Sequence, residues 1–285
     1  MRYSLLSSQA KYASFLLMQK ESEALAKSLL GKRGQGGLVA VPRYERRLLL
    51  GIDHKLPFQG VDQWTAYEFS WLQPNGVPVV RILEIDVPCE SPYLIESKSM
   101  KLYLGSYASK KASSEEDLIA LVASDMTVCA GSRVSVRAYS FETWMRPLGE
   151  FEGMCLDGID TICDAPFPHK NILIKRSETG FETLSTHLLR SNCLVTGQPD
   201  WGSLQIQYAG VLVDHASLLR YIVSFREHQE FHEHCIERIF ADLLAVLQPQ
   251  ELIVTGRYTR RGGIDINPFR SLTQLEPPYV RLIRQ

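Results

Sequence analysis

Residues 96–107 read Glu-Ser-Lys-Ser-Met-Lys-Leu-Tyr-Leu-Gly-Ser-Tyr, and residues 214–225 read Asp-His-Ala-Ser-Leu-Leu-Arg-Tyr-Ile-Val-Ser-Phe. The two stretches align at a constant offset of 118 residues. Apolar and aromatic side chains occur at equivalent positions in both, at 100, 103, 104 and 107 and at 218, 221, 222 and 225. This i, i+3, i+4, i+7 spacing is typical of a helix that packs one face on a core. The sequence therefore predicts an internal repeat built around this helix.

The agreement continues downstream at the same offset. A second set of apolar residues has helical spacing in both copies: Leu118, Leu121 and Val122, then Ile236, Ile239 and Phe240. Ser114 can cap the first of these helices, and the three acidic residues after it suit the positive end of the helix dipole. Further on, Val134 and Val136 match Leu252 and Val254 with the alternation of β-strands.

The segment before the first helix pair reads as a β-hairpin. Tyr67, Phe69 and Trp71 alternate with polar residues, residues 74–76 read Pro-Asn-Gly, and alternation returns at Leu83, Ile85 and Val87. Each module is therefore expected to contain two strands, two helices and two strands. This order predicts an α+β fold with helices on one face of an antiparallel sheet. Unpaired edges of such sheets favour side-by-side assembly of the modules.

Two prolines within residues 164–168 interrupt the pattern and indicate a boundary. We expect a first module over residues 42–165 and a second over residues 166–285, preceded by an unplaced segment at residues 1–41. The glycine-rich basic loop at residues 31–37 lacks the Gly-Lys-Ser/Thr ending of a phosphate-binding loop, so it is either a flexible connector or a ligand contact. No GxGxxG motif follows a predicted strand, which argues against a Rossmann crevice.

The bulk composition narrows the class of protein. The net charge is −1 over 285 residues, which gives no support for a nucleic-acid partner. No apolar run approaches the roughly 18 residues of a membrane helix, so no membrane association is expected. The six cysteines are scattered without a CxxC pair, which favours reduced thiols in a cytoplasmic protein.

A cluster of histidines precedes the last predicted helix. His228 and His232 have the i, i+4 spacing that can place two imidazoles on one zinc ion, with His234 and Cys235 nearby. Alternatively, His232 and Glu233 face a pocket at the helix start while His228 and His234 are solvated.

Two further residues have both a functional and a structural interpretation. Glu233, equivalent to Glu115 in the repeat, could accept paired hydrogen bonds from a guanine-like edge or could simply compensate the helix dipole. Cys193 stands in a loop seven residues before Asp200, so it is either a nucleophile with a nearby acid or a buried inert cysteine.

Three segments together resemble the NADPH-dependent 7-cyano-7-deazaguanine reductases of queuosine biosynthesis, in their long two-module form. They are residues 96–104, residues 193–202 (Cys-Leu-Val-Thr-Gly-Gln-Pro-Asp-Trp-Gly), and Phe231-His232-Glu233 with residues 260–265 (Arg-Arg-Gly-Gly-Ile-Asp). The resemblance implies the tunnelling fold, shared with GTP cyclohydrolase I, and nitrile reduction that needs no metal. It also implies a homodimer that acts on a small 7-deazapurine.

The resemblance assigns roles to particular residues. Cys193 would add to the nitrile carbon and form a covalent thioimide, Asp200 would donate protons, and NADPH would supply two hydrides to give 7-aminomethyl-7-deazaguanine. The substrate contacts would be Ile95, Glu96, Ser97, His232 and Glu233. The cofactor contacts would be Ser97, Lys98, Arg261 and Gly262, with the two cations suited to phosphates.

The repeat predicts that a complete site combines both modules. Lys98 is replaced by Ala216 in the second module, and Cys193 falls on Asn75 in the first, so each module keeps different parts of a site. We therefore expect the pocket at a module interface, within one chain or between subunits. Two alternatives remain: a metal-dependent tunnelling-fold hydrolase of a purine or pterin, and a non-catalytic purine-binding module.

Overall fold

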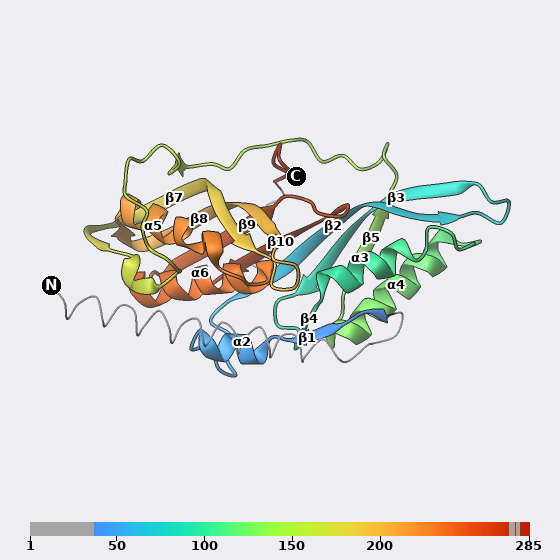
Figure 1. Cartoon of the computed structure of the whole chain (residues 1–285), viewed down its shortest axis with the longest axis horizontal. Helices are drawn as coiled ribbons and strands as arrows, with labels where there is room; N and C mark the ends of the chain where they lie inside the picture. The colour runs from blue at the N-terminus through green and yellow to red at the C-terminus, as the bar shows by residue number, and fades with distance from the viewer. Residues whose placement is uncertain (1–36, 274–276, 278–279) are drawn as a thin grey trace.

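The structure, a computed structural model, describes residues 37–273, 277 and 280–285 (Figure 1). Eight strands form one sheet in the order β5-β3-β2-β10-β9-β8-β7-β6, and β1 pairs with β4 beside it. The first half contains β1 (Ala40–Pro42), α2 (Tyr44–Leu49), β2 (Gln59–Leu72), β3 (Pro78–Pro88), β4 (Tyr93–Ile95), α3 (Ser97–Gly105), α4 (Glu115–Ala130) and β5 (Ser135–Tyr139). The second contains β6 (Met154–Cys155), η2 (Lys170–Ile172), β7 (Lys175–Asn192), β8 (Pro199–Val213), α5 (His215–Val223), η3 (Ser224–Glu227), α6 (His232–Leu247), β9 (Glu251–Tyr258) and β10 (Ile264–Ser271).

The internal repeat is confirmed. Helices α3 and α5 begin and end at residues that differ by the predicted offset, and hairpins β2–β3 and β7–β8 precede them in the two halves. The Ser114 hydroxyl accepts a hydrogen bond from the Asp117 backbone N–H, as expected of a helix cap. Its counterparts at α3 and α5 are the carboxylates of Glu96 and Asp214.

The helices cover one face of the sheet and form two cores with it. The apolar residues predicted for α3 and α5 are all buried. One core joins α3 and α4 to β2, β3 and β5, and the other joins α5 and α6 to β7, β8 and β9. The prediction that Leu121 packs in the core is wrong. Leu121 is 49% exposed, because it lies at the outer edge of the buried stripe of α4.

The first half departs from the expected order after β5. Its fourth strand does not form among the described residues; instead, residues 140–174 cross the molecule to the far end of the sheet (Figure 1). There β6 pairs in parallel with β7 through Met154 and Cys155. Pro147, Gly149 and Gly153 interrupt this segment, which explains why no long strand continues through it.

The two halves share one continuous sheet because β2 pairs with β10. The antiparallel register runs over eight residue pairs, from Ile264 opposite Ala66 to Ser271 opposite Gln59. At Gly60 the strands approach so closely that a Cβ atom would overlap the Phe269 carbonyl. The predicted side-by-side assembly of modules therefore takes place within one chain.

The line along which β2 pairs with β10 is here called the seam. Buried charged side chains join the elements that meet at it, on the helix side of the sheet. Arg43 donates a hydrogen bond to Asp62 Oδ2 at 2.6 Å, and Arg270 forms an ion pair with Asp62 Oδ1 at 2.8 Å. Arg270 and Arg47 also reach Glu237 Oε1 at 2.8 and 2.7 Å. These five side chains come from β2, β10, α6 and the segment around α2, and we call them the seam cluster.

The ionised state of Glu237 depends on the arginines of the seam cluster. Burial raises the pKa of Glu237, but Arg270 and Arg47 outweigh that effect and hold it well below its usual range. Removing one partner of a buried ion pair leaves the others desolvated and uncompensated.

We therefore predict that Glu237→Gln lowers the free energy of unfolding by about 3–5 kcal/mol, because three arginines lose their shared anion. The midpoint of urea unfolding measures this loss. The control is Glu115→Gln, which breaks the half-exposed bridge to Arg81 and should cost less than about 1 kcal/mol. Equal losses in the two variants would contradict the central role of the seam cluster.

Candidate active site

Cys193 lies in the tight loop between β7 and β8. The loop is closed by hydrogen bonds from the Cys193 N–H to the Gln198 carbonyl and from the Gly197 N–H to the Cys193 carbonyl, both 2.8 Å. Asn192 pairs with the segment that leads into α6, donating to the His228 carbonyl and accepting from the Glu230 N–H. The thiol is therefore held in a fixed position between the sheet and the start of α6.

The surroundings of the thiol favour its ionised form. Cys193 is buried, with 6% of its surface exposed. Burial raises the pKa of the thiol, but hydrogen bonds from the Thr196 hydroxyl and N–H, Arg261 and the Val195 N–H together lower it below its ordinary value. A lowered pKa distinguishes Cys193 from Cys89, Cys129 and Cys235, whose pKa values burial raises.

The turn between β9 and β10 orients Arg261 toward Cys193 and Asp200. Its N–H donates to the Ile264 carbonyl, and Gly262 and Gly263 have φ values of 62° and 77°. Two consecutive residues with positive φ form the type of turn that matches the strand twist, and glycine adopts it without steric cost. The Arg261 guanidinium then lies 3.2 Å from Asp200 Oδ1.

Asp200 lies between the Cys193 loop and the start of α6. It opposes Ser191 in the β7–β8 register, so it emerges beside the Cys193 loop. The carboxyl is buried and lies 3.6 Å from His232 Nε2. The His232 ring packs against Tyr258, with ring centroids 4.1 Å apart.

The first module contributes Lys101 to this site. Burial lowers the pKa of the Lys101 ammonium and nearby Arg261 lowers it further, while Cys193, Asp200 and Glu96 oppose them. The Lys101 side chain also packs over the turn, because a Cβ atom at Gly262 would lie 3.1 Å from its Cδ atom. Helix α3 and the turn at Arg261 and Gly262 therefore meet within one chain.

Glu233 lies deeper, between this site and the seam cluster. It is 3% exposed, at the first turn of α6 and four residues before Glu237. Burial and the neighbouring Asp62 raise the pKa of its carboxyl to about 7, although His232 and Arg43 favour the ionised form.

The other predicted contacts surround the start of α3. The Glu96 carboxylate accepts hydrogen bonds from the Lys98 and Ser99 N–H groups at 2.8 and 2.7 Å, so it caps the helix. Glu96 and exposed Lys98 line an open hollow with Val39 and Leu102. Ser97 is buried, and Ile95 packs in the first core.

The solvated positions expected for His228 and His234 are wrong. His228 is buried and pairs with Glu230 at 2.9 Å, and Glu230 also accepts from Arg238. His234 is fully buried, which lowers its pKa to about 4. Because His228 faces Glu230 and His232 faces Asp200, the two imidazoles do not converge as a zinc pair. The glycine-rich loop at residues 31–36 lies outside the described residues.

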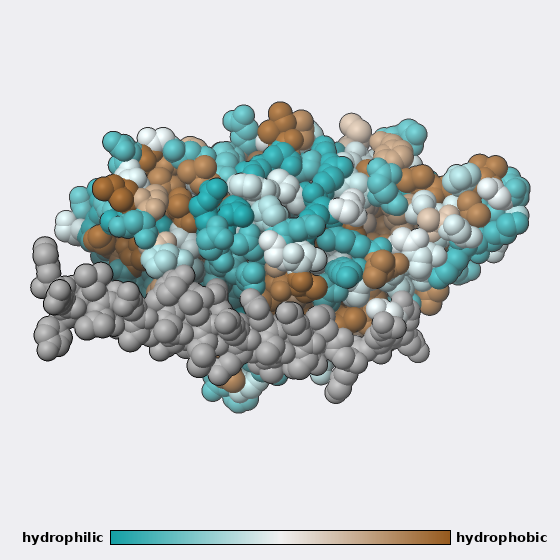
Figure 2. All heavy atoms as spheres, viewed as in Figure 1, coloured by the Kyte–Doolittle hydropathy of each residue, from teal (hydrophilic) through white to brown (hydrophobic). Residues whose placement is uncertain are grey.

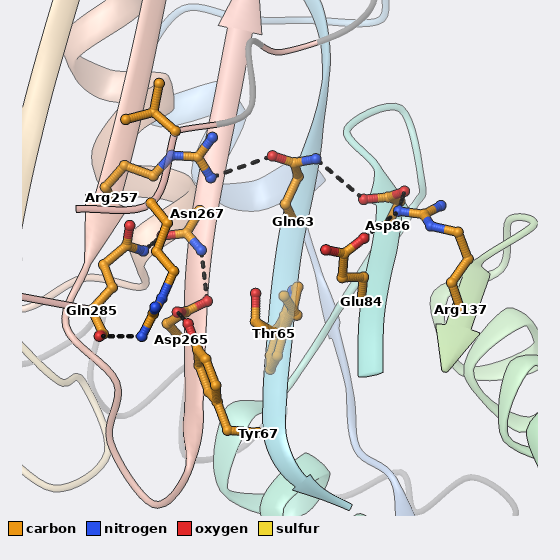
Figure 3. Close-up of a pocket in the computed structure, with 13 residues that line it drawn as sticks. Gln63, Thr65, Tyr67, Glu84, Asp86, Arg137, Arg257, Asp265, Asn267 and Gln285 are labelled. Carbon is orange, nitrogen blue, oxygen red and sulfur yellow. Dashed lines mark hydrogen bonds and ion pairs between the residues drawn. The ribbon is translucent and has the colours of Figure 1, made fainter. Parts of the chain in front are cut away.

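A separate polar pocket lies at the module seam, lined by residues of β2, β3, β5, β9 and β10 (Figure 3). Polar side chains that line this pocket form hydrogen bonds and ion pairs with one another. Asp265 accepts from the Tyr67 hydroxyl at 2.6 Å and from the Asn267 amide at 2.7 Å, and Arg137 lies 2.7 Å from Asp86. Cys193 and Asp200 do not line this pocket.

The visible surface in Figure 2 mixes hydrophilic and hydrophobic residues in small groups. In the part of the chain that the structure describes, no helix is long and apolar enough to cross a membrane. All six cysteines are unpaired.

Two family models match the chain. One, described as the N-terminal part of nitrile reductase, 7-cyano-7-deazaguanine reductase, matches residues 34–138, and another, described as a QueF-like protein, matches residues 199–277. Together they span more than half of the sequence. The chain belongs to the 7-cyano-7-deazaguanine reductase (QueF) family. It is a long, two-module member with an α+β fold.

A solved structure described as archaeosine synthase QueF-Like in the apo form is also similar, at 16% identity over 37% of this chain and 96% of that one, with a TM-score of 0.28. The family matches include Glu96 to Lys98, Asp200, His232, Glu233 and Arg261, whereas Cys193 lies between them.

Sequence reasoning missed Lys101 and Tyr258. Lys101 follows Lys98 by three residues, and this spacing places two cations on adjacent parts of one helix face. That signal was available in the sequence. Tyr258 carried no signal, because only the folded chain brings its ring edge-to-face against His232.

We predict that Cys193 reacts with iodoacetamide with a pH midpoint below that of an ordinary cysteine. Arg261→Ala should raise this midpoint by on the order of one pH unit, because a thiolate loses its cationic neighbour. Arg260→Ala is the matched control, since that guanidinium lies over the Tyr67 ring at 3.6 Å. Similar shifts in both variants would rule out a specific effect of Arg261.

A second prediction concerns Glu233. Because its pKa in the fold is raised to about 7, its ionisation destabilises the fold increasingly as pH rises from about 5 to 8. Glu233→Gln should therefore stabilise the protein by about 1–3 kcal/mol at pH 8, with a smaller gain at pH 5. Thermal unfolding at both pH values measures this. A gain in stability that does not change with pH would show that burial does not raise the pKa of this carboxyl.

Proposed function

We propose that this chain reduces the nitrile of 7-cyano-7-deazaguanine to 7-aminomethyl-7-deazaguanine with two equivalents of NADPH, in queuosine biosynthesis. The observation that carries the proposal is the Cys193 thiol, whose pKa is lowered although it is buried, beside Asp200 and Arg261. Membership of the nitrile reductase family supports the reaction class.

In the proposed first step the Cys193 thiolate attacks the nitrile carbon. A carbon–sulfur bond forms, one π bond of the nitrile breaks, and the nitrogen takes a proton. Asp200 is the proton donor in this scheme, because it emerges beside the Cys193 loop at the base of β8. The product is a covalent thioimide, and protonation of its nitrogen leaves a carbon that accepts a hydride far more readily than a nitrile carbon does.

The base is recognised by Glu233 and His232 in this proposal. A Glu233 carboxylate can accept two parallel hydrogen bonds from the ring N–H and amino group of a guanine-like edge. Its burial supports the role, because hydrogen bonds made away from water discriminate strongly between ligands. Ile95, Glu96 and Ser97 remain the proposed further contacts.

The cationic side of the site fits an anionic cofactor. Burial and the neighbouring Arg261 lower the pKa of Lys101, and bound phosphates would relieve the repulsion between the two cations. Ser97, Lys98 and Gly262 are the other proposed contacts. When bound, NADPH supplies the two hydrides. The role of the chain is to hold the thioimide, exclude water and deliver protons from Asp200.

We also propose that the protein is a cytoplasmic homodimer. Strand β5 ends the sheet on one side, and β6 covers only two residues of β7 on the other. Within the described residues both outer strands thus retain unpaired backbone groups, which a second copy can pair.

The decisive experiment is intact-protein mass measurement after incubation with 7-cyano-7-deazaguanine in the absence of NADPH. We expect a gain equal to one substrate molecule, reversed when NADPH is added, and no gain in Cys193→Ala. Cys163→Ser is the control, since that thiol is exposed and outside the site.

Other outcomes have distinct meanings. Substrate binding without a mass gain in the wild type would favour a purine-binding module. Hydrolysis that is lost on chelation would favour the metal-dependent hydrolase. Full turnover by Cys193→Ala would exclude the thioimide mechanism.

A further inference from the structure

Cys155, Asp157 and His187 converge on one point outside the Cys193 site. Their ligand atoms all lie within 4.8 Å of one another. Cys155 ends β6, Asp157 follows two residues later, and His187 lies on β7. Thiolate, imidazole and carboxylate are the three side-chain ligand types that zinc takes in proteins.

The backbone around the cluster is held firmly on the second module. The Leu156 N–H donates to the Ser185 carbonyl at 2.8 Å, directly after Cys155 pairs with Ser185. The Gln205 side chain donates to the Glu152 carbonyl at 3.1 Å. Cys155 is therefore presented from an anchored strand, although its side chain is exposed.

His187 is turned toward the cluster by a β-bulge. The β7–β8 register shifts between Thr186 and Leu189, so two residues of β7 face Ser203. His187 Nδ1 lies 2.9 Å from the Ser203 hydroxyl. A hydrogen bond at one ring nitrogen, which orients the ring and leaves a lone pair on the other, is the usual arrangement of a metal-binding histidine.

Asp157 is oriented by its own partners. Its Oδ1 accepts a hydrogen bond from the Thr186 hydroxyl at 2.6 Å. Both of its oxygens accept from the backbone N–H of His187 at 3.1 Å. Each carboxylate oxygen has more than one acceptor site, so Oδ2 keeps capacity for a metal. These contacts tie two of the three ligands to each other before any ion binds.

We propose that Cys155, Asp157 and His187 form a binding site for a divalent transition metal, with Zn²⁺ the best match. A thiolate and a carboxylate neutralise its charge, and the neutral imidazole completes a three-ligand set with one open position. Ligand atoms around tetrahedral zinc lie roughly 3.5 Å apart, given bonds of about 2.0–2.3 Å. The cluster must therefore close by on the order of 1 Å, which the exposed Cys155 side chain can do by rotation. The ion fastens the crossing segment, residues 140–174, to β7.

The test is a titration of metal-free, full-length protein with Zn²⁺ in competition with a chromophoric chelator. We expect one ion per chain, and at least tenfold weaker binding in Cys155→Ser, Asp157→Asn and His187→Ala. Cys163→Ser and Asp160→Asn are matched controls, because both residues are exposed in the same segment. Co²⁺ should give a thiolate charge-transfer band in the wild type that Cys155→Ser lacks.

Cys193→Ala separates this site from the proposed catalytic one. Zn²⁺ binding and the Co²⁺ band should be unchanged in that variant, whether or not the nitrile chemistry is confirmed. Loss of binding in Cys193→Ala would place the ion at the other site and overturn the proposal. Equal weakening in Cys163→Ser, or no weakening in the three ligand variants, would overturn it as well.

Discussion

The arrangement of this protein depends on the buried ion pairs of the seam cluster, in which Arg43, Arg47 and Arg270 surround Asp62 and Glu237. Buried ion pairs add little net stability, but breaking one is costly, so they select one arrangement over its competitors. Here they select the pairing of β2 with β10 and the position of α6 against that pair. The consequence for function is direct, because Glu233 lies one helical turn before Glu237 and His232 adjoins it. The same contacts that join the modules therefore place the side chains proposed to read the base.

The two modules show how equivalent positions acquire different roles. Asn75 lies in an exposed hairpin loop, whereas its counterpart Cys193 lies in a loop covered by the start of α6 and by the Arg261 turn. Glu115 forms a half-exposed bridge to Arg81, whereas its counterpart Glu233 is buried beside Asp62. The backbone is shared, and the difference lies in what packs over it. Burial and Asp62 raise the pKa of Glu233, whereas hydrogen bonds from Thr196, Arg261 and Val195 lower the pKa of Cys193.

The electrostatics of the site are asymmetric. Lys101 and Arg261 place positive charge on the side of Cys193 and Asp200, and this charge stabilises a thiolate and suits phosphates. On the other side, Glu233 and Asp62 place two carboxyls near each other, so burial and mutual repulsion raise the pKa of Glu233. A substrate with hydrogen-bond donors on one edge and an electrophilic carbon on the other matches this division. The first module takes part in this charge pattern through Lys101, because α3 lies against the Gly262 turn.

The sequence by itself determined the repeat, both helix pairs, the β2–β3 hairpin, the Ser114 cap and the family. Each of these depends on local periodicity or on a motif of adjacent residues, and local physics suffices to predict them. The α+β class followed from the order of the elements. Tertiary structure alone decided the seam cluster, the burial of His228 and His234, the course of residues 140–174 and the packing of Lys101 over Gly262. These depend on the register of strands far apart in the chain and on whether a polar side chain finds a buried partner. Hydrophobic periodicity carries no information about either, so a histidine that pairs with Glu230 reads in the sequence like one exposed to solvent.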